Sequence, residues 1–239
     1  MTDHNYELRF FEDSIYFREG QSISLEPAIR LLYVLKGSIT VNGKAIEQGQ
    51  GILEEEKFEL QIADDVTEFV RWELVPSGTA HTDILSLFKD SETSYGQSLN
   101  KRTDFIHLAG HETGLRLDTV TFPPGTRAYR HIHASCGIRY IIKGSLEINT
   151  EEGLDLMEQG HAWFEAVDSP VLAIAHDEIE TQFVRMMVLP VEYHGKLTIT
   201  YVDPADDDKP REQINNRLLD EIVQLNWQNT FSKIGRLPN

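Results

Sequence analysis

The chain has 239 residues, of which 40% are hydrophobic and 26% are charged, the balance of an ordinary soluble globular protein. Its 39 acidic and 22 basic residues give a net charge of −17, which repels phosphate backbones and anionic lipid surfaces and so argues against nucleic acid and membrane partners. No apolar run approaches the roughly 20 residues that a membrane-spanning helix needs.

The N-terminal residues and the cysteine content indicate a cellular compartment. The first seven residues, MTDHNYE, lack the basic and apolar regions of a secretory signal. The one cysteine, Cys136, cannot form an internal disulfide, as is usual in a reducing compartment. We therefore expect a cytoplasmic protein.

Short β-strands are predicted along the first half of the chain. Residues 8–35 alternate apolar and polar positions in short runs. The pair Asn42-Gly43, which lies between β-branched runs, predicts a tight hairpin. Residues 67–76, TEFVRWELVP, are typical of a long final strand.

The second half repeats this pattern in the same order. YVLKGS at 33–38 matches YIIKGS at 140–145, EQG at 47–49 matches EQG at 158–160, and TEFVRWELVP at 67–76 matches TQFVRMMVLP at 181–190. The spacing grows from 107 to 111 to 114 residues, as expected when short insertions accumulate in hairpin loops. The chain is thus an internally duplicated all-β protein.

Three parts follow from the repeat and from changes in composition. We expect an N-terminal unit at 6–90, a polar linker at 91–101, a C-terminal unit at 102–203 and a helical tail at 204–239. Within the tail, Asp208 and Pro210 favour a helix start, and apolar residues at helical spacing predict one amphipathic helix over 210–227. The apolar side of that helix would pack on the chain's own barrel or, alternatively, form a homodimer contact.

The most informative motif is His131-Ile132-His133, between Gly125 and Gly144. Side chains at i and i+2 of a strand share one face, so the two imidazoles can converge. These residues and spacings resemble the first motif of the cupin superfamily, and Gly160 matches the start of the second. With the duplication, the chain resembles a bicupin. The resemblance covers most of residues 15–76 and 110–190 and implies two jelly-roll barrels, each with a site at its mouth.

The resemblance also shows which metal ligands are missing. In the second half the motif's glutamate falls on Gly137 and its third histidine on Val171. In the first half the four ligand positions hold Glu26, Ala28, Arg30 and Leu60, so the N-terminal barrel is expected to lack metal ligands. The sequence leaves open whether the second barrel binds a divalent Fe, Ni, Zn, Cu or Mn ion through His131 and His133, or no metal.

Two further residues are candidates for completing a metal site. His176 lies near the position of the third histidine, although strand alternation would point it outward unless a bulge intervenes. Gln182 has the parity of Val184, Met186 and Val188, which we expect to form the inner face of the last strand.

Three residues are candidates for substrate binding. Arg139 should face inward, because by resemblance the position of Gly137 does. It would either clamp a carboxylate or phosphate or form an internal ion pair with Glu165. Tyr129 has the parity of the two histidines, and Cys136 is either a pocket residue or a plain buried thiol.

Two functions of different classes remain. The first is a metal-dependent cupin enzyme acting on a small polar or acidic molecule, most simply an oxygenase-like oxidoreductase, with a lyase or isomerase as its neighbour. The second is a non-catalytic bicupin that binds a small molecule or serves as an assembly module.

Overall fold

The computed structural model describes residues 3–16, 18–88 and 95–225. The described residues form short and long strands and include the single-turn 3₁₀ segments η1 (Leu85–Leu87), η3 (Val191–Tyr193) and η4 (Pro204–Asp206). The strands of the first half are β1 (Asp3–Tyr16), β2 (Ser22–Leu25), β3 (Ile29–Lys36), β4 (Ser38–Val41), β5 (Lys44–Glu47), β6 (Gly51–Glu54), β7 (Phe58–Ile62), β8 (Val66–Pro76) and β9 (Tyr95–Ala109). Those of the second half are β10 (Glu112–Phe122), β11 (Arg127–His133), β12 (Cys136–Lys143), β13 (Ser145–Asn149), β14 (Leu154–Glu158), β15 (Ala162–Glu165), β16 (Val171–Ala175), β17 (Thr181–Leu189), β18 (Ile199–Tyr201) and β19 (Ile214–Gln224).

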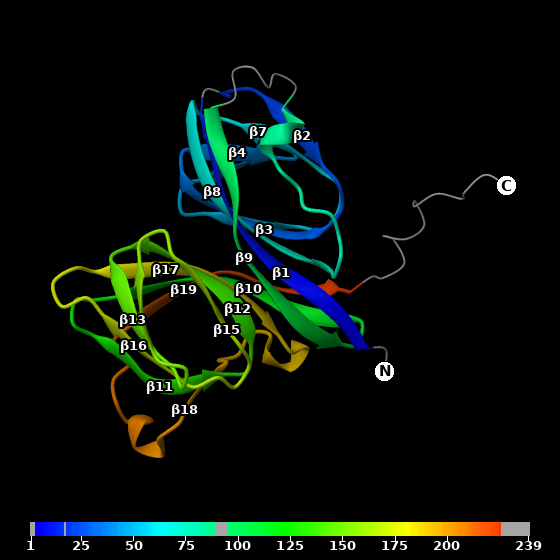
Figure 1. The fold of residues 1–239 in the computed structure, drawn as a ribbon. Helices are drawn as coiled ribbons and strands as arrows, with labels where there is room; N and C mark the ends of the chain where they lie inside the picture. The colour runs from blue at the N-terminus through cyan, green and yellow to red at the C-terminus, as the bar shows by residue number, and fades with distance from the viewer. Residues whose placement is uncertain (1–2, 17, 89–94, 226–239) are drawn as a thin grey trace.

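The two halves form two β-barrels of matching topology (Figure 1). The N-terminal barrel has sheets of order β6-β3-β8-β1-β9 and β2-β7-β4-β5. The C-terminal barrel has sheets of order β15-β12-β17-β10-β19 and β14-β13-β16-β11-β18. Each strand of the first barrel thus has a counterpart in the second, and all the pairings described are antiparallel.

A shared irregularity confirms the duplication residue by residue. The β3–β8 pairing shifts register between Val34 and Lys36, and the β12–β17 pairing shifts between Ile141 and Lys143. The two bulges are separated by the same 107 residues that separate the matching sequence motifs. A β-bulge at equivalent positions of both barrels is a feature inherited with the repeat.

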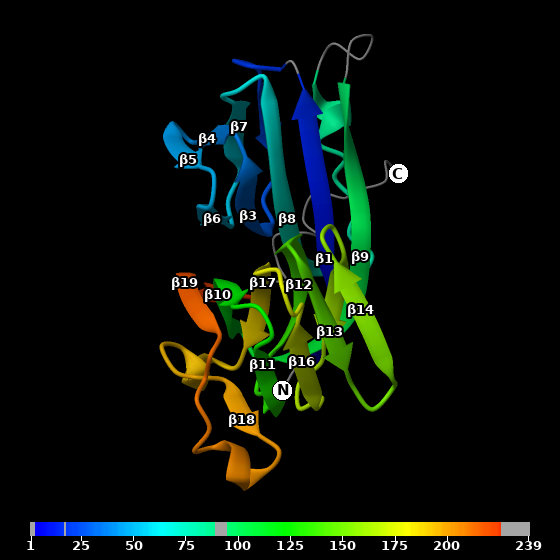
Figure 2. The same cartoon turned by 90° about the vertical axis from the view of Figure 1, so that its left-hand side faces the viewer.

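Apolar residues fill three regions. One cluster fills the interior of the N-terminal barrel and another fills part of the C-terminal barrel. The third lies between the two five-stranded sheets, where Trp72 and Phe10 of the first barrel meet Ile138 and Tyr140 of the second. The barrels therefore share one core, and Figure 2 shows the N-terminal barrel above the C-terminal one.

The predicted C-terminal helix over 210–227 is wrong for the described part of that range. Residues 214–224 form β19, which pairs with β10 along its whole length. Strand alternation buries Val223 and Leu225, whereas Ile214 and Ile222 remain 63% and 45% exposed. The open edge of β10 offers backbone hydrogen bonds that override a helical spacing of apolar residues. Residues 226 and 227 lie outside the described ranges.

The predicted linker at 91–101 is also corrected. Residues 95–101 belong to β9, which pairs with β1 and completes the sheet of the first barrel. Residues 91–94 lie outside the described ranges. Among the residues that the structure describes, no helix is long and apolar enough to cross a membrane.

Candidate functional site

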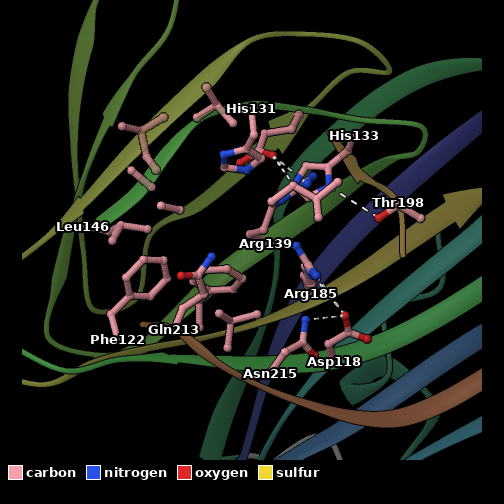
Figure 3. Close-up of a pocket in the computed structure, with 18 of the residues that line it drawn as sticks. Asp118, Phe122, His131, His133, Arg139, Leu146, Arg185, Thr198, Gln213 and Asn215 are labelled. Carbon is pink, nitrogen blue, oxygen red and sulfur yellow. Dashed lines mark hydrogen bonds and ion pairs between the residues drawn. The ribbon is translucent and has the colours of Figure 1, made fainter. Parts of the chain in front are cut away.

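Both predicted histidines point into the C-terminal barrel from β11. His131 and His133 are each 5% exposed, and their ring centroids lie 4.8 Å apart with the ring planes nearly perpendicular. They line a cavity of about 140 Å³ (Figure 3). The convergence predicted from their i, i+2 spacing is therefore present.

Hydrogen bonds fix the orientation of each imidazole. His131 Nδ1 lies 2.6 Å from the carbonyl oxygen of Tyr129, which can only accept, so Nδ1 carries the proton and Nε2 has a free lone pair. His133 Nδ1 lies 3.4 Å from the hydroxyl of Thr198, next to β18.

The barrel interior keeps both histidines neutral. Burial lowers the pKa of His131, although Glu165 opposes this shift. Burial lowers the pKa of His133 further, and the nearby Arg185 and Arg139 add to the effect. Because His133 is neutral, its Nε2 contact with Glu165 at 3.8 Å is not an ion pair.

Arg139 faces into the C-terminal barrel, as predicted. It lines the cavity, and its Nη2 lies 2.6 Å from Glu165 Oε2 in the ion pair that the sequence offered as the alternative. Its Nη1 donates to the carbonyl of Gly137 at 2.6 Å, and Trp163 Nε1 donates to the other oxygen of Glu165 at 2.9 Å. Burial lowers the pKa of Arg139 to about 10, so the guanidinium stays charged at neutral pH.

Four further arginines line the same cavity, and sequence reasoning missed them. Arg185 is held by Asp118 Oδ2 at 2.9 Å, and Arg116 is held by Asp220 at 3.0 Å. Arg211 reaches the cavity from the segment before β19, and Arg217, which pairs with Asp220 at 3.1 Å, reaches it from β19 itself. The lining carboxylates are Asp118 and Glu165, so guanidinium groups outnumber them in a chain of net charge −17.

One signal could have revealed Arg185. It matches Arg71 of the first barrel in the repeated motif, and Arg71 is likewise buried and paired with an aspartate, Asp13, at 2.9 Å. The sequence contains no pattern that assigns Arg211 or Arg217 to the cavity, because the apolar spacing of the tail predicts a helix outside the barrel.

Two candidate ligands lie outside the cavity. Gln182 Nε2 donates to the hydroxyl of Thr121 at 3.1 Å. Gln182 lies outside the cavity because β17 turns Phe183 and Arg185 inward. The residues with the parity of Gln182, namely Val184, Met186 and Val188, pack between the barrels. The parity was therefore assigned to the wrong face. His176 is exposed in the loop after β16, where its ring accepts from the backbone N–H groups of Glu178 and Ile179.

Two candidate substrate residues also lie outside the cavity. The register of β11 shifts between Ala128 and His131, so Ala128 rather than Tyr129 shares the inner face, and the ring of Tyr129 lies beneath Lys209. Cys136 packs in the core between the barrels, where burial raises its pKa to about 11. It is the plain buried thiol of the second interpretation.

The described residues do not complete a metal site. Among them there is no group of three or more His, Cys, Asp and Glu side chains placed to hold an ion. The third histidine position, Val171, is apolar and 2% exposed. At Gly137 any Cβ would collide with the carbonyl oxygen of Met186, so the missing glutamate could not fit there.

Charged side chains occupy the matching part of the N-terminal barrel. Arg30 occupies one ligand position and binds Glu73 at 2.7 Å, and Arg71 binds both Glu73 and Asp13. Leu60 is fully buried, whereas Glu26 lies on the surface and pairs with Lys57. The interior that forms a cavity in the second barrel holds an ion-pair network in the first.

No protein-family model matches the sequence, and no curated protein matches it. Solved structures are similar in fold. AerE from Microcystis aeruginosa is 14% identical with a TM-score of 0.55, over 76% of this chain and 88% of that chain. The oxalate decarboxylase of Lactobacillus farciminis, solved as a formate complex, is 11% identical with a TM-score of 0.53, over 87% and 82%. The 11S allergen of Cocos nucifera is 11% identical with a TM-score of 0.54, over 82% and 83%.

These similarities define the class of protein. The chain has the tandem cupin fold that the His-x-His motif and the repeat predicted. At such low identities the likeness shows the fold alone. Because a decarboxylase and an allergen share it, the fold does not choose between catalysis and binding.

Proposed function

We propose that the C-terminal barrel binds a small molecule that carries a carboxylate group. The observation that carries this proposal is the excess of guanidinium groups around the cavity of the C-terminal barrel in a strongly acidic chain. Arginine binds carboxylates through two parallel hydrogen bonds, and a low-dielectric site strengthens them. In this proposal the carboxylate binds Arg185 and Arg139, which lie beside His133 (Figure 3).

Titration with benzoate, followed by calorimetry, tests this proposal. Arg211 is exposed at the cavity, with its guanidinium over the ring of Tyr201, so Arg211→Gln should remove a positive charge at little cost to the fold and weaken benzoate binding by about tenfold. Arg127→Gln is the matched control, because Arg127 is exposed on β11 but does not line the cavity. Equal loss of binding in both variants, or no binding by the wild type, would contradict the proposal.

A second candidate is a metal-dependent, oxygenase-like oxidoreductase at His131 and His133. The bond from His131 Nδ1 to a backbone carbonyl favours it, since metal-binding histidines are usually oriented in this way. The two imidazoles are one ligand short of the three protein ligands that are usual in catalytic sites. A lyase or isomerase is the neighbouring alternative, because a neutral imidazole can move a proton of a bound carboxylate-bearing molecule.

Metal analysis of protein purified without chelator separates these candidates. One bound ion per chain, lost in His133→Ala and kept in His176→Ala, would support the metalloenzyme. A protein that binds benzoate but contains no metal would contradict the metalloenzyme and support the carboxylate-binding function, with or without catalysis.

A further inference from the structure

The cavity has two chemically different sides. The imidazoles and the guanidiniums of Arg139 and Arg185 form the polar side. Across from them, Figure 3 shows Phe122 and Leu146. Other apolar residues that line the cavity include Val120, Ala128, Ile148, Trp163, Val171, Ala173 and Phe183. A ligand that fills the cavity therefore needs an apolar body as well as an anionic group.

The volume limits the size of that body. A buried apolar cavity of about 150 Å³ accepts a benzene molecule. The 140 Å³ here is of the same order, so the apolar side accommodates one six-membered ring or a branched chain of similar size. Phe122 and Phe183, whose ring centroids lie 6.2 Å apart, offer flat apolar faces to such a ring.

Gln213 places one amide group on the apolar side. It precedes β19, and Figure 3 shows it beside Phe122 and farther from Arg139 and Arg185. Its Oε1 is buried and has no hydrogen-bond partner among the described residues, whereas Asn215, two residues on, donates to Asp118 at 3.4 Å. An unpaired buried amide oxygen is costly, and a hydrogen-bond donor on a ligand would remove that cost.

We propose that the ligand is a small cyclic or aromatic carboxylic acid that carries a hydroxyl group at the end opposite its carboxylate. This inference rests on the proposed function, because Arg185 and Arg139 hold the carboxylate. The ring lies against Phe122 and Phe183, and the hydroxyl bonds the amide of Gln213. A site with a polar group placed for a ligand hydroxyl discriminates against the analogue that lacks it.

Calorimetric titrations with benzoate, 4-hydroxybenzoate and phenol test this assignment on the full chain. The wild type should bind 4-hydroxybenzoate about five- to tenfold more tightly than benzoate, the gain of one hydrogen bond, and phenol most weakly. Gln213→Leu should abolish the preference while keeping benzoate binding. Gln182→Leu is the matched control on the outer face of β17 and should keep the wild-type preference.

The outcomes separate this inference from the function on which it rests. Equal affinity of the wild type for benzoate and 4-hydroxybenzoate, or an unchanged preference in Gln213→Leu, would overturn the role of Gln213 and leave carboxylate binding in place. Failure of both acids to bind would overturn the two proposals together. The wild-type comparison needs no variant, so a folding defect in Gln213→Leu cannot mask the result.

Discussion

Arg139 and Glu165 form an ion pair in the wall of the cavity. Arg139 is 1% exposed, and the side chain of Glu165 is 10% exposed. Removing two charges from water is expensive, and only their close contact and further hydrogen bonds offset that cost. The ion pair with Glu165 thus fixes the Arg139 guanidinium in the cavity wall, beside the histidines.

Arg139→Leu should lower the free energy of unfolding by about 3–5 kcal/mol, because it leaves the Glu165 carboxylate buried without its partner. Urea denaturation measures this loss. The double variant Arg139→Leu/Glu165→Gln should recover part of it, since a neutral amide is cheaper to bury. An unchanged urea midpoint in the single variant would show that the pair contributes nothing to stability.

His133 should make stability depend on pH. The folded-state pKa of His133 lies well below the ordinary value because of burial and the neighbouring arginines. In the unfolded chain the pKa of this histidine is about 6.5. Below the pKa of the unfolded chain, the unfolded state binds more protons than the folded state. The stability that a neutral His133 contributes is therefore complete above the unfolded-state pKa and is lost as the pH falls toward the folded-state pKa.

Chelator-treated His133→Gln should therefore lose less stability than the wild type between pH 7.5 and 5.5. Urea midpoints across this interval measure the difference between the two slopes. His176→Gln, which changes an exposed histidine outside the cavity, is the control and should keep the wild-type slope. Equal slopes for His133→Gln and the wild type would contradict the burial of a neutral His133.

Among the structural elements, β19 differs most from its sequence-based prediction, and this affects the site. As a helix, the segment would have packed outside the barrel. As a strand on the edge of β10, it brings Asn215 and Arg217 to the cavity, and Gln213 just before it. Local apolar spacing could not reveal this, because the free edge of β10 exists only in the folded sheet.

Two substitutions distinguish the strand from the helix. Ile222 and Leu225 would share one side of a helix, three residues apart, so both would be costly to truncate. In the structure, Leu225, which directly follows β19, is 2% exposed, and Ile222 of β19 is 45% exposed. Leu225→Ala should cost about 2–5 kcal/mol of unfolding free energy and Ile222→Ala much less. Similar large losses in chemical denaturation of both variants would favour the helix.

Strand parity predicted some positions correctly and failed at others for identifiable reasons. Counting from Gly137 placed Arg139 inside the barrel, as observed. Counting from His131 and His133 failed for Tyr129, because a bulge interrupts β11 between Ala128 and His131. Counting from Val184, Met186 and Val188 failed for Gln182, because both faces of β17 are apolar. These three residues face the core between the barrels rather than the barrel interior.

The two barrels behave as one packed body through the apolar cluster between their long sheets. Trp72 is fully buried there, packs on Phe10 with ring centroids 5.0 Å apart and donates to the carbonyl of Ile138 at 3.2 Å. The repeat in the sequence predicted two barrels, but it could not show that the residues outside each interior form a common core.

Trp72→Ala should cost about 3–5 kcal/mol and destabilise both barrels, because the cavity that it leaves lies between them. Amide hydrogen exchange should show reduced protection in β12 and β17 as well as in β8. Protection in β17 that stays at the wild-type level would indicate that the barrels unfold independently.

NMR titration with benzoate shows whether a carboxylate-bearing molecule binds inside the C-terminal barrel. The indole N–H of Trp163 donates to Glu165 in the cavity wall, whereas that of Trp72 lies between the barrels. We predict a saturable shift of the Trp163 indole signal with little change at Trp72. A Trp163 signal that stays fixed while benzoate is added to excess would contradict the account.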